Sequence, residues 1–228
     1  YVSSVNVLPT WNILRLLTKN GLKKFIYFST IHVYGTLPNT IINEDFVTAP
    51  QNTYGLTHLL SENICNYFNA TTKTDCINIR LSNGYGSPAF NYIDCWSLVL
   101  NDFCKTAYQK EKIIINSDGS PLRDFIHSYD IANALELIIK YSKHNIYHIA
   151  SGETVSILEL ANKVKDVYYN RYNKQICISL SEQGNKSKIK EKEKYTLSIK
   201  RLSDIGFKKD QGIDFGINEI FDYMENLS

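Results

Sequence analysis

Two kinds of hydrophobic pattern alternate in the first third of the chain. Apolar residues recur at spacings of three and four over residues 7–17, which predicts an amphipathic helix, and Gly21 follows where a C-terminal cap is expected. KKFIYFS at 23–29 is a short continuous apolar run, typical of a strand buried on both faces of a parallel sheet. Residues 53–70 again show a helical period, and CINIRLS at 76–82 again indicates a strand. This order of elements predicts crossover units and a parallel sheet.

The helix over 53–70 is predicted to carry a broad apolar face. That face consists of Leu56, Leu59, Leu60, Ile64, Tyr67 and Phe68.

The second half of the chain mixes helical and strand patterns without an internal repeat. Helices are expected near 92–108, from about Tyr129 to Tyr141, and in DFGINEIFDYM at 214–224; strands are expected in KIIIN at 112–116, IYHIA at 146–150 and QICISL at 175–180. DGSPLRDFI at 118–126 is predicted to be a turn-rich connection, because glycine and proline favour turns. Ser156 and Glu159 form a capping box for a helix that ends near Tyr168.

Composition narrows the class of protein. The 228 residues are 43% hydrophobic and 21% charged, as in an ordinary globular protein, and the formal charge of +2 is too small to indicate a nucleic-acid or membrane partner. The five cysteines include no CxxC and mostly lie in apolar runs, which indicates reduced, buried thiols in a cytoplasmic protein and neither a disulfide framework nor a metal site. Lysine and glutamate alternate over 182–196, which predicts a solvated loop, with a phosphate contact from one of its lysines as the alternative.

Three side chains that could take part in catalysis are expected near one another. Tyr54 and His58 are four residues apart, so on a helix they project from the same face, one turn apart. Thr30 ends the strand that precedes them, at the edge where ligands of parallel α/β sheets bind. The spacing alone favours an ordinary helix that contains a buried tyrosine.

A series of motifs gives these residues a context. NVLPTWNILRLLTKNGLKKFIYFSTIHVYG, YGLTHLLSE, IRLSNGYGSP, DGSPLRDFIHSYDIANAL, IYHIASGETVSILELA and SIKRLSDIGF follow one another along the chain. Their order and spacing resemble those of the extended short-chain dehydrogenase/reductases, in the NAD-dependent epimerase/dehydratase branch. The resemblance extends from about residue 2 to the C-terminus.

The resemblance implies an α/β fold: a partial Rossmann-like, doubly wound parallel sheet that lacks its N-terminal strands, with a smaller C-terminal α/β substrate lobe. Residues 1–90 would be the C-terminal part of the NAD-binding domain. Residues 91–228 would be mainly the substrate lobe, with the chain returning to the Rossmann domain near 113–150.

The resemblance also assigns roles to the residues at the strand end. Thr30 would hydrogen-bond the sugar oxygen that is oxidised, and Tyr54 would be the acid/base that takes the hydroxyl proton. Tyr54, His58 and Leu81 would contact the cofactor. NAD is the implied cofactor, with NADP as the alternative, and no metal is implied.

Two further residues would hold a nucleotide-sugar substrate. The resemblance places Asn83 against the nucleotide-sugar and Arg123 on its phosphates, a role that suits the guanidinium fork. The alternative for Arg123 is a salt bridge within RDF. The resemblance further implies a homodimer formed through the helices near 5–19 and 53–70.

The chain departs from the family pattern at His58. The family has a lysine there, whose charge favours the phenolate form of the tyrosine. A free phenol has a pKa near 10, whereas a free imidazole has a pKa near 6.5 and is mostly neutral at pH 7. We therefore expect His58 to supply little charge, although it could still hydrogen-bond a ribose hydroxyl.

A second departure concerns the glycine-rich GxxGxxG turn that receives the cofactor pyrophosphate. No such turn occurs in the sequence, whose only GxG is at 84–86. We expect the chain to be a piece of a longer protein or a truncated product, missing two βαβ units of roughly 60 residues. The predicted function is nucleotide-sugar epimerase or dehydratase chemistry, impaired in this chain. The alternatives are a non-catalytic remnant that binds a sugar nucleotide or a partner subunit, and an NADPH-dependent keto-sugar reductase.

Overall fold

The computed structural model describes residues 1–181 and 194–227, and the chain divides into two compact units. The first unit comprises Tyr1–Ser82, Ala134–Gly152 and Tyr195–Lys208; the second comprises Asn83–Asn133, Glu153–Lys194 and Lys209–Ser228. The first division falls after Ser82, whereas the sequence suggested a boundary at residue 90. Which unit serves the cofactor and which the substrate stays a prediction.

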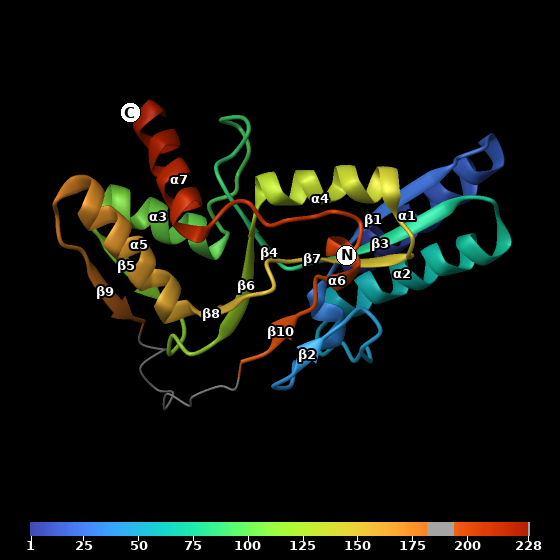
Figure 1. Ribbon diagram of the computed structural model, residues 1–228, viewed down its shortest axis with the longest axis horizontal. Coiled ribbons are helices and arrows are strands. Elements are labelled where there is room, and N and C mark those ends of the chain that lie inside the picture. The colour runs from blue at the N-terminus through green and yellow to red at the C-terminus, as the bar shows by residue number, and fades with distance from the viewer. Residues whose placement is uncertain (182–193, 228) are drawn as a thin grey trace. The chain divides into compact units, whose positions relative to one another are not determined.

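A parallel sheet lies at the centre of the first unit. Its strands are β1 (Lys24–Thr30), β3 (Asp75–Leu81) and β7 (Ile146–Ile149), in the order β1-β3-β7 (Figure 1). The register pairs Thr30 with Leu81, so these two strands end level with each other. The parallel sheet predicted from the alternating helix and strand patterns is therefore confirmed.

Two helices pack together beside this sheet. Helix α1 (Val2–Leu17) contacts α2 (Thr53–Thr71), which in turn packs on β1 and β3. Trp11 of α1 lies edge-on to Phe68 of α2, with ring centroids 5.4 Å apart. A 3-10 turn, η1 (Thr18–Asn20), follows α1 and ends at the predicted glycine cap, Gly21, whose φ of 78° is left-handed.

The predicted apolar face of α2 is largely not the buried face. Leu56, Leu60 and Tyr67 are each more than 40% exposed. The buried residues of the helix are Gly55, Thr57, Ser61, Glu62, Cys65 and Phe68. Their polar groups are satisfied inside the unit: the Asn6 amide of α1 donates to the Thr57 hydroxyl at 3.0 Å, and the Ser61 hydroxyl donates to the Asn6 carbonyl. Hydrogen bonds to α1 thus satisfy the polar groups on the buried side of α2.

Burial of β1 on both faces is likewise not observed. The strand is only half-buried over most of its length, and Phe28 is 44% exposed. Within the described residues β1 pairs with β3 alone, so it forms an edge of the sheet.

Short elements complete the first unit. They are η2 (Ile31–Tyr34), β2 (Ile41–Ile42), β10 (Thr196–Leu197) and α6 (Lys200–Ser203), and β2 pairs in parallel with β10. Helix α4 (Ser128–Tyr141), predicted from about Tyr129, begins in the second unit and ends in the first.

The second unit has an apolar core of its own. Its elements are β4 (Asn83–Tyr85), α3 (Val99–Lys110), β5 (Lys112–Ile115), β6 (Leu122–His127), β8 (Thr154–Ser156), α5 (Ile157–Tyr172), β9 (Cys177–Leu180) and α7 (Ile213–Leu227). The strands form a sheet β4-β6-β8 and a parallel pair β5-β9. Helices α3, α5 and α7 contact one another around a buried cluster that includes Leu160, Ile220 and Phe221.

Two predictions for this unit are wrong in detail. Helix α3 begins at Val99, not near residue 92, because the preceding loop folds on itself: the Asp94 carboxylate accepts from the Trp96 backbone at 3.2 Å. The connection at 118–126 contains a strand, β6, which starts directly after Pro121. The turn residues at the beginning of that segment concealed the strand.

The capping box is confirmed. The Ser156 hydroxyl accepts from the Glu159 backbone at 3.0 Å, and the Glu159 carboxylate accepts from the Ser156 backbone at 2.6 Å. The helix it starts, α5, continues to Tyr172 and so is longer than predicted.

All five cysteines are free, and three are buried: Cys65, Cys76 and Cys104. Cys177 is exposed, contrary to the expectation for its apolar run. In the part of the chain that the structure describes, no helix is long and apolar enough to cross a membrane, and no cluster of side chains suits a metal ion. The predicted loop at 182–196 lies mostly outside the described residues.

Candidate functional site

The site is built at the end of β1, where the strand turns directly into η2. Thr30 is 5% exposed, and its Oγ1 accepts a hydrogen bond from the His32 backbone N–H at 3.2 Å. The threonine therefore caps the 3-10 turn that follows it. Because a hydroxyl can accept and donate at once, this bond leaves the Thr30 proton available for a ligand oxygen.

Two glycines bring the turn and the helix together. A Cβ on Gly55, in the first turn of α2, would lie 2.5 Å from the His32 carbonyl oxygen. Gly35 has a φ of 71°, and a Cβ there would lie 2.2 Å from the Ala49 carbonyl oxygen. Any larger residue at either position would push η2 away from the segment against which it packs.

Tyr54 and His58 lie together on α2, as their spacing predicts. Their ring centroids are 4.5 Å apart at an interplanar angle of 66°. Tyr54 is 48% exposed, so the alternative of a buried tyrosine is wrong. His58 is half-buried, and its Nδ1 lies 2.9 Å from the Tyr27 hydroxyl of β1.

The environment of His58 keeps its imidazole neutral. Burial lowers its pKa below the ordinary value, and the nearby His32 lowers it further, although Glu62 and a hydrogen bond to the Phe28 backbone act in the opposite direction. Burial also raises the pKa of Tyr27 to about 12, so this phenol stays protonated. The expectation that His58 carries little charge at neutral pH agrees with this environment.

A third ring, that of His32, completes the cluster, and no role was predicted for it. Its side chain is exposed, and its ring centroid lies 5.8 Å from that of Tyr54, edge-on at 74°. The Tyr54 ring therefore contacts two imidazoles, His32 from η2 and His58 from α2. Its position in the sequence could have indicated it as a site residue, because His32 follows Thr30 by two residues at the ligand-binding edge of the sheet.

A buried network of polar side chains supports the cluster from inside the unit. Arg80 of β3 donates twice to the Glu62 carboxylate of α2, at 3.0 and 2.7 Å, and the Ser29 hydroxyl of β1 donates to the same carboxylate at 2.5 Å. Arg80 also donates to the Tyr34 hydroxyl at 2.8 Å. The Arg80–Glu62 pair thereby joins β1, β3, α2 and η2.

His148 of β7 extends this network. Its Nδ1 lies 2.9 Å from the Ser198 carbonyl and its Nε2 lies 2.5 Å from the Tyr34 hydroxyl, so the neutral ring donates to the carbonyl and accepts from the phenol. Burial lowers the pKa of His148 to about 4, and the positive charges of Arg80 and Arg201 lower it as well. Burial likewise raises the pKa of Tyr34 to about 12.

Leu81 ends β3 level with Thr30, on the same edge of the sheet. The next residue, Ser82, has a buried hydroxyl with no hydrogen-bond partner among the described residues. A buried polar atom of this kind calls for a partner. A polar ligand at this edge would supply one.

The remaining two predicted residues belong to the second unit. The Asn83 amide donates to the Asp124 carbonyl at 2.8 Å, which pairs the start of β4 with β6. Arg123 donates to the Leu122 carbonyl at 3.0 Å and is half-buried. Among the ion pairs of the described residues none involves Arg123, so the predicted alternative of a salt bridge within RDF is not observed.

Comparison with known proteins identifies the family. The family model described as "NAD dependent epimerase/dehydratase family" matches residues 1–150. This chain belongs to the NAD-dependent epimerase/dehydratase family. The predicted resemblance is thereby confirmed.

Individual members of the family are similar over different lengths. A relative from Methanocaldococcus jannaschii is 27% identical over 230 residues, which are 99% of this chain and 71% of the relative. The UDP-glucose 4-epimerase of Mycoplasma genitalium is 29% identical over 191 residues, which are 75% of this chain and 56% of that protein. The chain thus spans between about half and seven-tenths of these two family members.

A solved structure in the family shares the fold. The UDP-glucuronic acid 4-epimerase from Bacillus cereus, in complex with UDP-glucuronic acid and NAD, matches with a TM-score of 0.80 at 21% identity. The match covers 98% of this chain and 68% of that protein. At this level of identity the likeness shows the fold, a Rossmann-like α/β architecture, as predicted.

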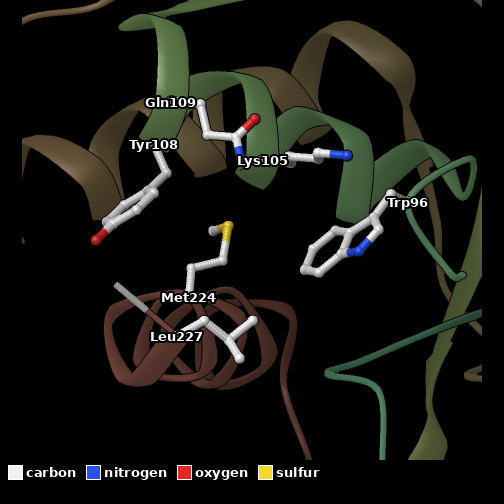
Figure 2. A pocket seen from close by; sticks show the side chains of 6 residues that line it. All are labelled: Trp96, Lys105, Tyr108, Gln109, Met224 and Leu227. Carbon is white, nitrogen blue, oxygen red and sulfur yellow. The ribbon is translucent and has the colours of Figure 1, made fainter. Parts of the chain in front are cut away.

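A pocket in the second unit lies apart from the residues that the family pattern identifies. It has a volume of about 290 Å³ and lies between α3 and α7 (Figure 2). Its lining consists of Trp96, Lys105, Tyr108, Gln109, Met224 and Leu227. The Lys105 ammonium lies 5.4 Å from the centroid of the Trp96 ring, so a cation–π contact forms one wall.

Proposed function

We propose that this chain carries the sugar-oxidising site of an NAD-dependent nucleotide-sugar epimerase or dehydratase. The observation that carries the proposal is the contact series at the end of β1: Thr30 accepts from the His32 backbone, the His32 ring contacts Tyr54, and Tyr54 contacts His58. A hydroxyl, a phenol and titratable nitrogens at the carboxyl end of a parallel sheet are the groups that proton transfer from a sugar hydroxyl needs.

The residues present fit one end of the cofactor. The exposed Tyr54 phenol and the unpartnered Ser82 hydroxyl beside Leu81 are polar groups that a nicotinamide riboside could engage. Tyr54, His58 and Leu81 would hold that end, and the nicotinamide, when bound, supplies a hydride acceptor. For the pyrophosphate end the family's binding turn is not in this sequence, which contains no GxxGxxG.

The chain's own residues would divide the work on the sugar hydroxyl. The Thr30 hydroxyl, fixed by its bond to the His32 backbone, would donate to the sugar oxygen and orient it. Tyr54 in its phenolate form would accept the hydroxyl proton. In the second unit, Asn83 and Arg123 would bind the nucleotide part of the substrate, the guanidinium pairing with phosphate oxygens.

A non-catalytic role is the second candidate, and one observation favours it. His58 is held neutral by burial and contacts Tyr27, so the residue in the family's lysine position does not provide that lysine's charge. In this case the chain would bind a sugar nucleotide without oxidising it.

The two candidates differ in what Tyr54→Phe does. We would measure conversion of UDP-glucose to UDP-galactose with NAD, and with NADP in parallel, on this chain and on a longer form that includes a GxxGxxG segment. For an enzyme we expect Tyr54→Phe to reduce turnover about a hundredfold or more, because it removes the acid/base. Tyr67→Phe is the matched control, since this exposed tyrosine lies on the same helix.

Equal turnover by the wild type and Tyr54→Phe would disprove the assignment. Binding of UDP-glucose by isothermal titration without turnover in either form of the protein would support the non-catalytic candidate. Arg123→Ala should weaken that binding in both cases.

We also propose that the chain pairs with a second copy through α1 and α2. Both helices expose apolar side chains: Val5, Leu8 and Leu16 on α1, and Leu56, Leu60 and Tyr67 on α2. Burying such a surface would stabilise a dimer. Sedimentation of Leu60→Glu should show a monomer, whereas Leu158→Glu, at an equally exposed leucine of α5, should sediment as the wild type does. Monomeric wild-type protein at micromolar concentration would rule out this interface.

A further inference from the structure

The pocket between α3 and α7 belongs entirely to the second unit, so all of its walls come from one compact part of the chain. Its volume is about 290 Å³. A cavity of about 150 Å³ takes up benzene, so this pocket has room for a single aromatic ring or for two fused rings. Ligand pockets typically combine an apolar lining with a few polar groups that orient the ligand.

Two aromatic rings and a thioether form the apolar part of the lining. Figure 2 shows the rings of Trp96 and Tyr108 on opposite sides of the pocket, with the Met224 side chain extending from α7 toward the space between them. Trp96 packs on Tyr223 and Tyr108 packs on Tyr172, each with ring centroids 6.1 Å apart. Met224 is 6% exposed. These packed groups suit a flat ring, which gains from ring–ring and sulfur–aromatic contacts.

Lys105 supplies the charge of the pocket. Its ammonium lies 5.4 Å from the centroid of the Trp96 ring. Asp102 lies one turn earlier on α3, and the pKa of its carboxyl is raised by burial and lowered by the Lys105 charge. Among the ion pairs of the described residues, however, none involves Lys105. The N–H groups of this ammonium can therefore donate to an anionic ligand.

Gln109 adds a second donor on the same side of the pocket. It follows Lys105 by four residues on α3, so the two side chains project from the same face of the helix. Both belong to the lining. One cation beside one amide matches a single negative charge, which favours a carboxylate over a phosphate dianion.

We propose that this pocket binds a small aromatic carboxylate. Its ring would lie between the Trp96 and Tyr108 rings, against Met224. Its carboxylate would accept hydrogen bonds from the Lys105 ammonium and the Gln109 amide. The binding is non-covalent and does not depend on the proposed function, because none of the residues at the end of β1 takes part in it.

Met224 makes a specific test possible, because it is the only methionine of the sequence. A chain whose methionine methyl group carries an isotope label gives one labelled signal in an NMR spectrum, and that signal comes from the pocket. The probe is naphthoate, since the ring current of a bound aromatic ring shifts a nearby methyl signal. We expect a saturable shift with a dissociation constant on the order of millimolar, as for a ligand of this size.

The contribution of the charge is tested by a matched pair of variants and a matched pair of ligands. Lys105→Gln should weaken naphthoate binding about tenfold, because a hydrogen bond to a charged group is lost. Lys110→Gln makes the same change at an exposed lysine of α3 outside the lining, and should bind naphthoate as the wild type does. Naphthamide has the same rings without the charge, and should bind the wild type about tenfold more weakly than naphthoate does. In Lys105→Gln the two ligands should bind equally.

Three results would overturn the proposal. The first is a Met224 signal that does not shift at millimolar naphthoate. The second is equal naphthoate binding by the wild type and Lys105→Gln, or equal binding of naphthoate and naphthamide by the wild type, since the carboxylate would then not contact Lys105. The third is tighter binding of cyclohexanecarboxylate than of naphthoate, because an aliphatic acid would then fit the lining better than an aromatic one.

Discussion

Two polar clusters of the first unit share β1 and α2 but differ in nearly every physical property. The network around Arg80 is buried: Arg80 and Glu62 are at most 4% exposed, and two hydrogen bonds join them. The ring cluster around Tyr54 is open to solvent: Tyr54 is 48% exposed, and the rings of His32 and His58 contact its ring. Adjacent residues of one strand, Ser29 and Thr30, lead into the two clusters. Burial and strong pairing therefore distinguish the cluster that stabilises the fold from the one that can react.

The largest expected effect comes from breaking the buried network. Arg80→Ala leaves the Glu62 carboxylate buried without its partner, and we expect it to lower the free energy of unfolding by about 4 kcal/mol. Denaturation with guanidinium chloride measures the change in the free energy of unfolding, and faster hydrogen exchange should appear in β1, β3 and β7. Lys140→Ala, which breaks the exposed pair with Glu136, is the control and should leave the unfolding curve unchanged. If Arg80→Ala also left the unfolding curve unchanged, the network would not stabilise the unit.

A second substitution tests whether the second unit unfolds independently of the first. Leu160 is fully buried between α3, α5 and α7, and Leu160→Ala should cost about 3 kcal/mol through the cavity it leaves. Faster hydrogen exchange should be confined to those helices. If exchange rises equally in β1 and β3, the two units unfold as one.

The pH dependence of stability should reveal the buried histidine of the network. The folded-state pKa of His148 is lowered to about 4, so the unfolded chain, whose histidine has an ordinary pKa near 6.5, takes up the proton first as pH falls. The stability contribution is therefore complete above pH 6.5 and is lost progressively between pH 6.5 and 4, by up to about 3 kcal/mol. His148→Asn should flatten this part of the curve. Parallel curves for the two proteins would show that another group titrates.

The smallest effect concerns a cap far from both clusters. Ser156→Ala removes one bond of the capping box at the start of α5 and should cost about 1 kcal/mol. Its unfolding midpoint, measured beside that of Ser156→Thr, tests whether the hydroxyl itself is responsible: the threonine should retain most of the stability.

The sequence was sufficient to predict the parallel sheet, the capping box and the pairing of Tyr54 with His58, because these depend on local periodicity and spacing. It did not reveal which side of α2 would be buried, since hydrophobicity favoured Leu56 and Leu60 whereas Asn6, Ser29 and Arg80 satisfy the polar side instead.

His32 and β6 were missed for different reasons. The position of His32 beside α2 depends on the close approach of Gly55, a contact between segments more than twenty residues apart that no local pattern encodes. Strand β6 was concealed by the turn residues that precede it, because a glycine and a proline dominate a local interpretation even where a strand follows them.

The two tryptophans have a practical consequence for spectroscopy. Trp11 packs against Phe68 in the first unit, and Trp96 lies beneath the Lys105 ammonium in the second. Since the chain contains no other tryptophan, each unit carries its own intrinsic fluorophore. Selective excitation of indole in Trp11→Phe and Trp96→Phe proteins would therefore record the melting of one half of the molecule at a time, with no label attached.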